Sequence, residues 1–269
     1  MNQYQVVVAD IDGTLINQDK QLTDVTKSAI EMIKQKGILF GIATGRPIRS
    51  VSNLLKKFGI YEYVDFMVCS NGAEIIDLKT QQIQITYQLT KDDVLNIIDF
   101  MKPTGINYCI YDQDKMYTNE INSIVSYLSG LNMLEPVVTR TIDLPIETTN
   151  KVIFTIYPED ILKLNQHMIS FQSKEYRAFF TQPELFEFVD ARISKAIGIE
   201  SFVSQKNIPM SNVVAFGDAD NDREMIIESG LGVAMSNARD TLKAVADDIA
   251  KSNEQDGVAS YLFCLFSNS

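Results

Sequence analysis

Two short acidic clusters are the part of this chain most able to do chemistry. The first reads Asp-Ile-Asp-Gly-Thr at positions 10–14, and the second reads Gly-Asp-Ala-Asp-Asn-Asp at positions 217–222. Each follows an apolar run, 4–9 and 213–216, that predicts a strand buried on both faces of a parallel sheet. Ligands of open α/β sheets bind beyond the carboxyl ends of the strands, so both clusters are expected at that edge.

The first cluster has the residue types needed for phosphoryl transfer. A carboxylate such as Asp10 can attack phosphorus and form an acyl phosphate, and a second acid such as Asp12 can then exchange protons with the leaving group and with water. In an extended chain these two side chains face one way, unless the chain turns between them. Gly13 allows the tight turn by which the chain leaves the sheet. The alternative, a solvated turn with two aspartates, is common for an Asp-Gly pair alone, but the second acidic cluster makes it the weaker option.

The second cluster predicts a metal site together with the first. Carboxylates gathered at two strand ends repel one another unless a cation lies between them, and a few carboxylate oxygens completed by water and phosphate describe a Mg²⁺ site. The alternative is an acidic helix N-terminus, which suits Asp220 and Asp222 because the helix dipole favours negative charge there. It does not explain Asp218, which precedes the helix.

A chain with a formal net charge of −11 needs local positive groups to accept an anion. Thr44 and Gly45 follow another apolar run and precede Pro47, so they are expected at a helix N-terminus, where phosphates bind. A Thr-Gly-Arg triplet alone is more often just a turn. Lys195 stands early in a later predicted helix, where a cation gains nothing from the helix dipole, but where it can neutralise phosphoryl oxygens.

Alternating strands and helices are expected to position these residues, which predicts a doubly wound α/β core. Thr23 caps a predicted helix that Gly37 ends, and Pro47 opens a second that ends near Gly59. The expected strands are 4–9, 38–43 and 65–69. The apolar stripe expected on the first helix is Val25, Ala29, Ile30 and Ile33.

From about residue 73 the pattern changes to alternating apolar and polar residues, typical of strands with one solvated face. The helices expected in the middle lie near 91–101, 119–128 and 159–171, and the strands at 152–157, 176–181 and 185–189. After residue 194 the pattern of buried strands returns. We therefore expect one core, 1–83 and 191–269, divided by an inserted α/β cap domain, 84–190.

Composition excludes several classes of function. The acidic charge argues against nucleic-acid or anionic-membrane partners. Cys69, Cys109 and Cys264 are scattered, which predicts structural thiols in a reducing compartment. With no apolar leader or bilayer-length apolar run, we expect a cytoplasmic protein. His167 is the only histidine and is expected at the surface, so histidine-based triads and zinc catalysis have little support.

Four parts of the sequence resemble, in order, the four motifs of the haloacid dehalogenase (HAD) superfamily. They are segment 10–14, Thr44, Lys195 and segment 217–222. The segments that resemble its Cof-type sugar-phosphate phosphatase branch are 70–73, 232–238 and 256–259. This similarity covers both parts of the core and is thin in the insert, whose position matches the large α/β (type IIB-like) cap of that branch. The sequence departs from the family's usual pattern at two positions, Ala196 and Ser236, where glycine is common.

The resemblance implies a Rossmann-like core and a Mg²⁺-dependent phosphatase that passes through a phosphoaspartate. Asp10 would be the nucleophile and a metal ligand. Asp12 would be the general acid/base, and its backbone carbonyl would be a second ligand. Asp218 would bind the metal directly, and Asp222 directly or through water.

The resemblance also implies which groups hold the substrate, a small phosphorylated metabolite such as a sugar phosphate. The phosphoryl oxygens would be held by the side chains of Thr44, Lys195 and Asn221 and by the backbone N–H groups of Ile11 and Gly45. The cap would close over the leaving group and select it.

Three alternatives stay open. A phosphomutase or phosphotransferase would use a sugar hydroxyl in place of water as the acceptor. A non-enzymatic phosphoacceptor such as a response-regulator receiver uses similar carboxylates around Mg²⁺, but it lacks a large insert and needs no acid two residues beyond the acceptor. A degenerate binding or regulatory protein is disfavoured because all the catalytic positions are filled.

Overall fold

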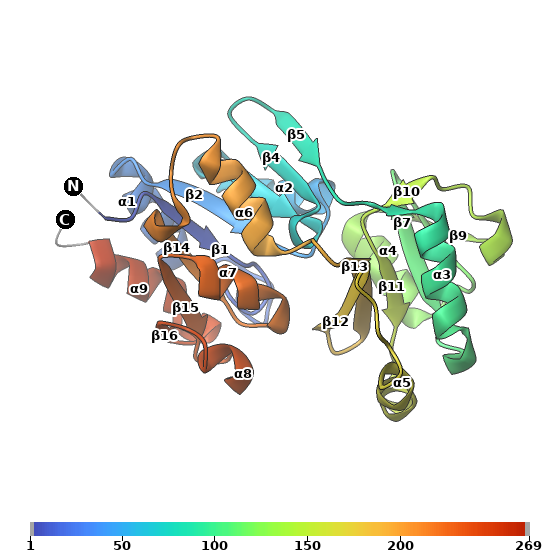
Figure 1. The fold of residues 1–269 in the computed structure, drawn as a ribbon. Coiled ribbons are helices and arrows are strands. Elements are labelled where there is room, and N and C mark those ends of the chain that lie inside the picture. Colours follow the sequence, from blue (N-terminus) through green and yellow to red (C-terminus); the bar gives the residue numbers. More distant parts are fainter. Residues whose placement is uncertain (1–2, 267–269) are drawn as a thin grey trace. The chain divides into compact units, whose positions relative to one another are not determined.

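The computed structural model describes residues 3–266, which form two compact units (Figure 1). The residues up to Thr86, together with those from Ser194 onward, form the core unit. Residues Tyr87–Ile193 form the insert unit. The chain therefore passes twice between the units. Each unit has its own hydrophobic core.

The core unit is built on an eight-stranded sheet of order β16-β15-β14-β1-β2-β3-β4-β5. Its parallel strands are β1 (Val6–Ala9), β2 (Leu39–Ala43), β3 (Phe66–Cys69), β14 (Val213–Gly217), β15 (Leu231–Met235) and β16 (Asp248–Ala250). Strands β1 to β3 extend the sheet toward one edge, and strands β14 to β16 extend it toward the other. The strand order therefore reverses between β1 and β14, and ligands of such sheets bind at this point, beyond the carboxyl ends of the strands. The predicted doubly wound parallel sheet is confirmed.

An antiparallel hairpin extends this sheet beyond β3. Its strands are β4 (Glu74–Asp77) and β5 (Gln82–Ile85). The change of pattern near residue 73 thus marks a hairpin of the core sheet, and the insert unit starts after it.

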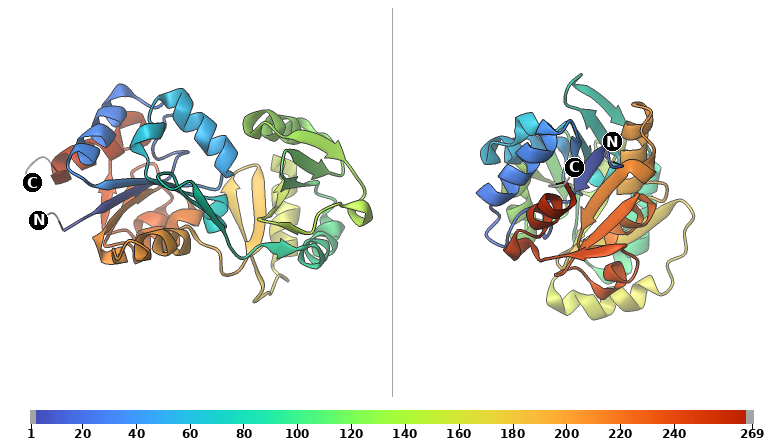
Figure 2. Two further views of the ribbon diagram at one scale, coloured as in Figure 1. Left: turned by 90° about the horizontal axis from the view of Figure 1, so that it is seen from above. Right: turned by 90° about the vertical axis from the view of Figure 1, so that its left-hand side faces the viewer.

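Helices cover both faces of the core sheet (Figure 2). They are α1 (Asp24–Gln35), α2 (Ile48–Phe58), α6 (Lys195–Ser204), α7 (Arg223–Glu228), α8 (Asp240–Lys243) and α9 (Gly257–Phe266). Helix α1 packs against α9, and α6 packs against α7. Pro47 caps the start of α2, and Gly59 ends it in the left-handed conformation, as the sequence predicts.

The apolar stripe expected on α1 is wrong at one position. Val25 is exposed, and Thr26 takes the buried place instead. The reason is a polar contact: the hydroxyl of the capping residue Thr23 donates a 2.6 Å hydrogen bond to Asp256, just before α9, and the Thr26 hydroxyl lies 3.4 Å from the same carboxylate. This contact turns the first helical turn so that threonine faces inward.

The insert unit holds a six-stranded sheet of order β12-β13-β11-β7-β8-β9, antiparallel except between β8 and β9. Its strands are β7 (Tyr108–Asp112), β8 (Lys115–Thr118), β9 (Glu135–Val138), β11 (Val152–Thr155), β12 (Tyr176–Gln182) and β13 (Leu185–Asp190). Two short strands, β6 (Leu89–Thr90) and β10 (Thr148–Thr149), form a separate ribbon.

Helices α3 (Lys91–Met101), α4 (Ser123–Asn132) and α5 (Ile161–Met168) cover the insert sheet. Side chains of α3 and α5 share one apolar cluster, and those of α4 belong to another. Helix α4 starts later than expected, because the side chain of Asn122 caps it by accepting a hydrogen bond from the Val125 N–H.

The expected surface position of His167 is wrong. This residue of α5 is half-buried, with its ring 4.6 Å from that of Phe100 on α3 and its Nε2 2.8 Å from the Phe100 carbonyl oxygen. It therefore packs between two helices of the insert.

Residues 3–266 contain neither a disulfide bond nor a helix that could span a membrane. All three cysteines are free, with Cys69 and Cys109 buried and Cys264 exposed. Within residues 3–266, no helix has the length and apolar character needed to cross a membrane.

Gly72 is required where the loop after β3 meets the start of α6. Its φ is +112°, and a Cβ there would lie 2.1 Å from the Ser194 carbonyl oxygen. Gly37 is a matched control, because its φ is +76° and a Cβ there would meet nothing within 4 Å. We predict that Gly72→Ala lowers the free energy of unfolding by roughly 3 kcal/mol or more, and Gly37→Ala by about 1 kcal/mol. Equal losses in urea titrations of the two variants would contradict this account.

Candidate active site

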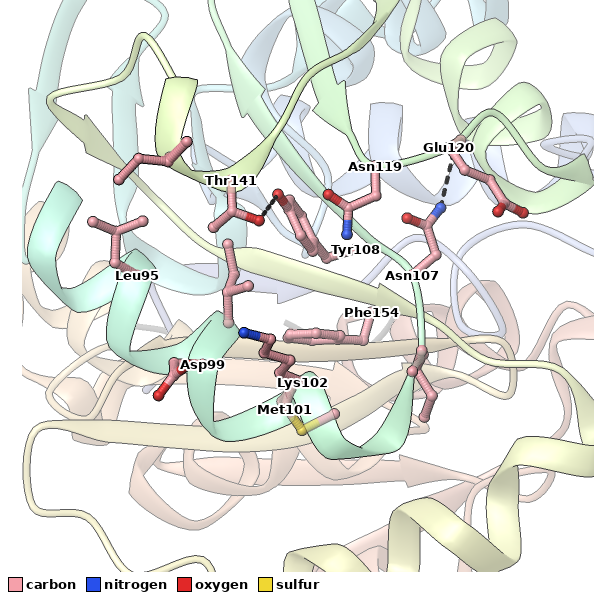
Figure 3. Close-up of a pocket in the computed structure, with 14 residues that line it drawn as sticks. Leu95, Asp99, Met101, Lys102, Asn107, Tyr108, Asn119, Glu120, Thr141 and Phe154 are labelled. Atoms are coloured by element: carbon pink, nitrogen blue, oxygen red, sulfur yellow. Dashed lines mark hydrogen bonds between the residues drawn. The ribbon is translucent and has the colours of Figure 1, made fainter.

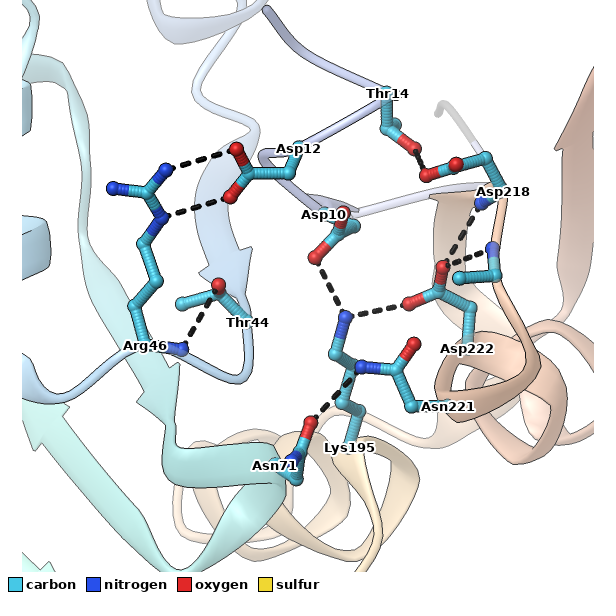
Figure 4. Close-up of polar contacts among 11 residues, drawn as sticks. Asp10, Asp12, Thr14, Thr44, Arg46, Asn71, Lys195, Asp218, Asn221 and Asp222 are labelled. Atoms are coloured by element: carbon cyan, nitrogen blue, oxygen red, sulfur yellow. Dashed lines mark hydrogen bonds and ion pairs between the residues drawn. The ribbon is translucent and has the colours of Figure 1, made fainter. Parts of the chain in front are cut away.

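A buried lysine joins the ends of two strands. Lys195, the first residue of α6, is 1% exposed, and its Nζ lies 2.6 Å from Asp10 Oδ1 and 2.6 Å from Asp222 Oδ1 (Figure 4). Burial alone would lower the pKa of this ammonium, but the two carboxylates outweigh burial and raise it. Lys195 is therefore held in its charged form, since a buried cation is tolerated when it is paired.

The loop after β14 is ordered around Asp222. Its Oδ2 accepts hydrogen bonds from the backbone N–H groups of Asp218 and Ala219, both at 2.9 Å. These bonds form a short turn, Asp220–Asp222, that leads into α7. Both carboxylate oxygens of Asp222 are thus engaged, one by the turn and the other by Lys195.

Asp218 approaches the turn that follows β1. Thr14 Oγ1 donates a 2.9 Å hydrogen bond to Asp218 Oδ1. Gly13 has a φ of +83°, and a Cβ there would lie 2.3 Å from Asp218 Oδ2. Only glycine fits both this conformation and this close approach, so the Asp-Gly pair serves the contact between the two acidic clusters.

Asp10, Asp218 and Asp222 form a group suited to a divalent cation. Each offers a carboxylate oxygen, and these atoms all lie within 4.8 Å of one another. Three carboxylates beside the single Lys195 ammonium leave a net charge of −2. Burial and the neighbouring carboxylates accordingly raise the pKa of Asp10 well above its usual value and that of Asp218 to about 7. Hard oxygen donors with an excess of negative charge fit Mg²⁺ or a similar ion.

Asp12 lies in a different environment from Asp10. The chain turns between them, and Asp12 faces Arg46 (Figure 4). Arg46 Nε lies 2.8 Å from Asp12 Oδ2, Arg46 Nη2 lies 2.8 Å from Asp12 Oδ1, and Lys20 Nζ lies 3.0 Å from the same Oδ1. Burial alone would raise the pKa of Asp12, but the hydrogen bonds and charge of Arg46 and Lys20 outweigh burial and lower it.

Three of the predicted phosphate-binding residues, Thr44, Gly45 and Asn221, lie around Asn71. Asn221 Nδ2 donates a 3.0 Å hydrogen bond to Asn71 Oδ1, and the Asn71 N–H donates to the Thr44 carbonyl. A Cβ on Gly45 would lie 3.2 Å from Asn71 Oδ1. The backbone of Ile11 forms the turn just after Asp10, where its carbonyl accepts from three following N–H groups. The structure thus places these residues at the carboxyl end of the core sheet.

Comparison with known proteins identifies the family. The sequence model of haloacid dehalogenase-like hydrolases matches residues 7–262. The chain belongs to that family. A Streptococcus pyogenes protein is 31% identical over 266 residues, which cover 95% of this chain and 96% of the relative. The family assignment confirms the predicted enzyme class, a hydrolase.

Two relatives of this hydrolase carry names that state a substrate. A Bacillus subtilis protein named 5-amino-6-(5-phospho-D-ribitylamino)uracil phosphatase is 26% identical, covering 97% of each chain. A Yersinia pseudotuberculosis protein named HMP-PP phosphatase is 24% identical, covering 96% of this chain and 94% of its own.

Solved structures show the same fold. A haloacid dehalogenase-like hydrolase from Bacteroides thetaiotaomicron has a TM-score of 0.83 at 25% identity, covering 98% of this chain and all of its own. A structure described as a HAD subclass IIB sugar phosphatase has a TM-score of 0.83 at 20% identity, covering 97% of this chain and all of its own. These structures confirm the predicted fold.

Four residues of the hydrolase contact the site but were not predicted as part of it: Thr14, Lys20, Arg46 and Asn71. Asn71 follows β3 as Asp10 follows β1, so the rule that polar residues at strand ends form the site also predicts Asn71. Arg46 belongs to a triplet that, taken alone, is more often just a turn. Its contact with Asp12 joins residues 34 positions apart, which spacing alone does not reveal.

The insert unit has a separate cavity of about 590 Å³ (Figure 3). Buried apolar side chains such as Met101 and Phe154 line it, and the Tyr108 hydroxyl lies 2.9 Å from Thr141 Oγ1 at its edge. None of the predicted site residues lines this cavity.

The pairing of Lys195 predicts a large effect on stability. We expect Lys195→Met to lower the free energy of unfolding by roughly 3–5 kcal/mol near neutral pH, because buried carboxylates lose their counter-ion. Lys206 is the matched control: its Nζ lies 2.8 Å from Asp77 Oδ2, and its side chain is 35% exposed. Lys206→Met should cost about 1 kcal/mol or less. Urea denaturation of both variants measures the difference, and similar midpoints would show that Lys195 does not hold the cluster together.

Proposed function

We propose that this hydrolase is a Mg²⁺-dependent phosphatase of small phosphorylated metabolites that works through a phosphoaspartate on Asp10. The observation that carries the proposal is the buried Asp10 carboxylate, held by Lys195 beside Asp218 and Asp222 where β1 and β14 end. The names of the Bacillus and Yersinia relatives support the phosphatase assignment.

The ligands proposed for Mg²⁺ are the carboxylates of Asp10 and Asp218 and the backbone carbonyl of Asp12. Asp222 would act through a water molecule, since Lys195 and the turn already engage its two oxygens. When bound, the ion supplies the positive charge that the cluster lacks and that a phosphate requires.

In the first step an oxygen of Asp10 attacks phosphorus. A new O–P bond forms while the bond from phosphorus to the leaving oxygen breaks, and that oxygen takes a proton from Asp12. Lys195 favours the ionised Asp10 that this attack requires. The side chains of Lys195, Thr44 and Asn221 and the N–H groups of Ile11 and Gly45 would hold the phosphoryl oxygens.

In the second step Asp12 acts as a base. Its carboxylate takes a proton from water as the water oxygen attacks phosphorus, and the bond between phosphorus and Asp10 breaks. Phosphate leaves, and Asp10 is again a carboxylate. Asp12 gives the proton that it took from water to the next leaving group, and the lowered pKa of Asp12 favours this release. The net reaction consumes one ester and one water and yields one alcohol and one phosphate.

The direct test is phosphate release from 4-nitrophenyl phosphate and a panel of sugar phosphates, with Mg²⁺ and with EDTA. We expect turnover only with Mg²⁺, and a loss on the order of 10³-fold or more in Asp10→Asn, since the nucleophile is then absent. Release without any acceptor sugar would remove the phosphotransferase alternative. Wild-type turnover in Asp10→Asn would contradict the proposal.

A second prediction concerns Asp12. Asp12→Asn should slow both formation and breakdown of the phosphoenzyme by about 10²–10⁴-fold, because both steps lose their proton carrier. Metal binding should be largely spared, since the proposed ligand is the backbone carbonyl. Rapid-quench kinetics and Mg²⁺ titration measure the two effects. A variant that keeps wild-type turnover would show that Asp12 is not the acid/base.

A further inference from the structure

The ion pair between Arg46 and Asp12 is a two-pronged contact. Arg46 Nε and Nη2 each reach a different oxygen of the carboxylate, both at 2.8 Å. The Asp12 side chain is 22% exposed, so water competes little with the pair. A planar guanidinium that donates to both oxygens fixes the plane of the carboxyl group, which a single contact does not.

Arg46 is itself fixed at the phosphate-binding edge of the site. Its N–H donates to Thr44 Oγ1 at 3.2 Å, and its carbonyl accepts from the Ser70 N–H at 3.0 Å. The segment proposed to hold the phosphoryl oxygens therefore also sets the direction of Asp12.

Lys20 contacts the same carboxylate in a different way. Its Nζ makes one contact with Asp12 Oδ1, and its side chain is 54% exposed. Oδ1 therefore accepts hydrogen bonds from both cations, whereas within residues 3–266 Oδ2 accepts from Arg46 alone. A carboxylate oxygen accepts about two hydrogen bonds, so Oδ2 can accept one more hydrogen bond, from an oxygen of the substrate or of water.

We propose that Arg46 is a positioning residue that holds Asp12 with Oδ2 directed toward the oxygen that enters or leaves phosphorus. Oδ2 is then the atom that gives a proton to the leaving group and takes one from water. This inference rests on the proposed acid/base role of Asp12. It assigns to Arg46 no contact with the substrate.

The test uses 4-nitrophenyl, phenyl and benzyl phosphate, which are similar in size but have increasingly basic leaving groups. In rapid-quench single turnovers, Arg46→Ala should slow phosphoenzyme formation by about 10²-fold with benzyl phosphate, whose leaving group needs a proton, because small misplacements of a catalytic group have effects of this size. With 4-nitrophenyl phosphate the loss should stay below about 10-fold, and KM should change little for all three.

Two further variants complete the test. Arg46→Lys keeps the positive charge but cannot donate to both carboxylate oxygens as a planar guanidinium does. Its rates of phosphoenzyme formation should therefore fall in the same order across the three esters, but by smaller factors. It also carries the test if Arg46→Ala does not fold. Arg49→Ala removes an exposed arginine from α2 and should leave all three rates unchanged.

The outcomes separate this inference from the proposed function. If Asp12→Asn shows the dependence on the leaving group but the Arg46 variants slow all three esters equally, or raise only KM, Arg46 binds the phosphoryl group and the inference is wrong. Unchanged rates in the Arg46 variants would overturn it as well. If Asp12→Asn itself shows no dependence on the leaving group, the acid role fails and the positioning inference fails with it.

Discussion

The ion pairs of Lys195 with Asp10 and Asp222 are the contact on which the site depends. Lys195 is separated along the chain from Asp10 by 185 residues and from Asp222 by 27. The whole insert lies between Asp10 and Lys195, yet the first residue of α6 returns to the end of β1. Without this ammonium, buried carboxylates at adjacent strand ends would face one another unpaired, which is costly in a protein interior.

A second constraint keeps two neighbouring aspartates in different surroundings. Asp10 faces a buried ammonium and other carboxylates, whereas Asp12 faces Arg46 and Lys20 at a more open position. The chain turns at Ile11, between the two aspartates, which separates their side chains. The two carboxyl groups therefore have different partners although they lie two residues apart, and the partners of Asp12 are both cations.

One rule predicts the proposed site from the sequence: polar residues after buried strands meet at the carboxyl edge of the sheet. This rule places Asp10 and Asp218 without knowledge of their contacts. It could not reveal that Arg46 pairs with Asp12, because that contact depends on a turn whose direction is set by packing. The exposed Val25 is a similar case. Val25 and Thr26 each lie one turn before a buried residue of α1, so spacing does not choose between them, and the polar contact of Thr26 with Asp256 does.

The most direct test of the account is to identify the residue that carries the phosphoryl group during turnover. The wild-type hydrolase with Mg²⁺ would be mixed with 4-nitrophenyl phosphate, quenched within the first turnover, reduced with borohydride and mapped by peptide mass spectrometry. Borohydride converts an aspartyl phosphate to homoserine, and the account predicts this conversion at Asp10 alone. Conversion at another residue, or a full burst of phosphate with no modified peptide, would contradict it.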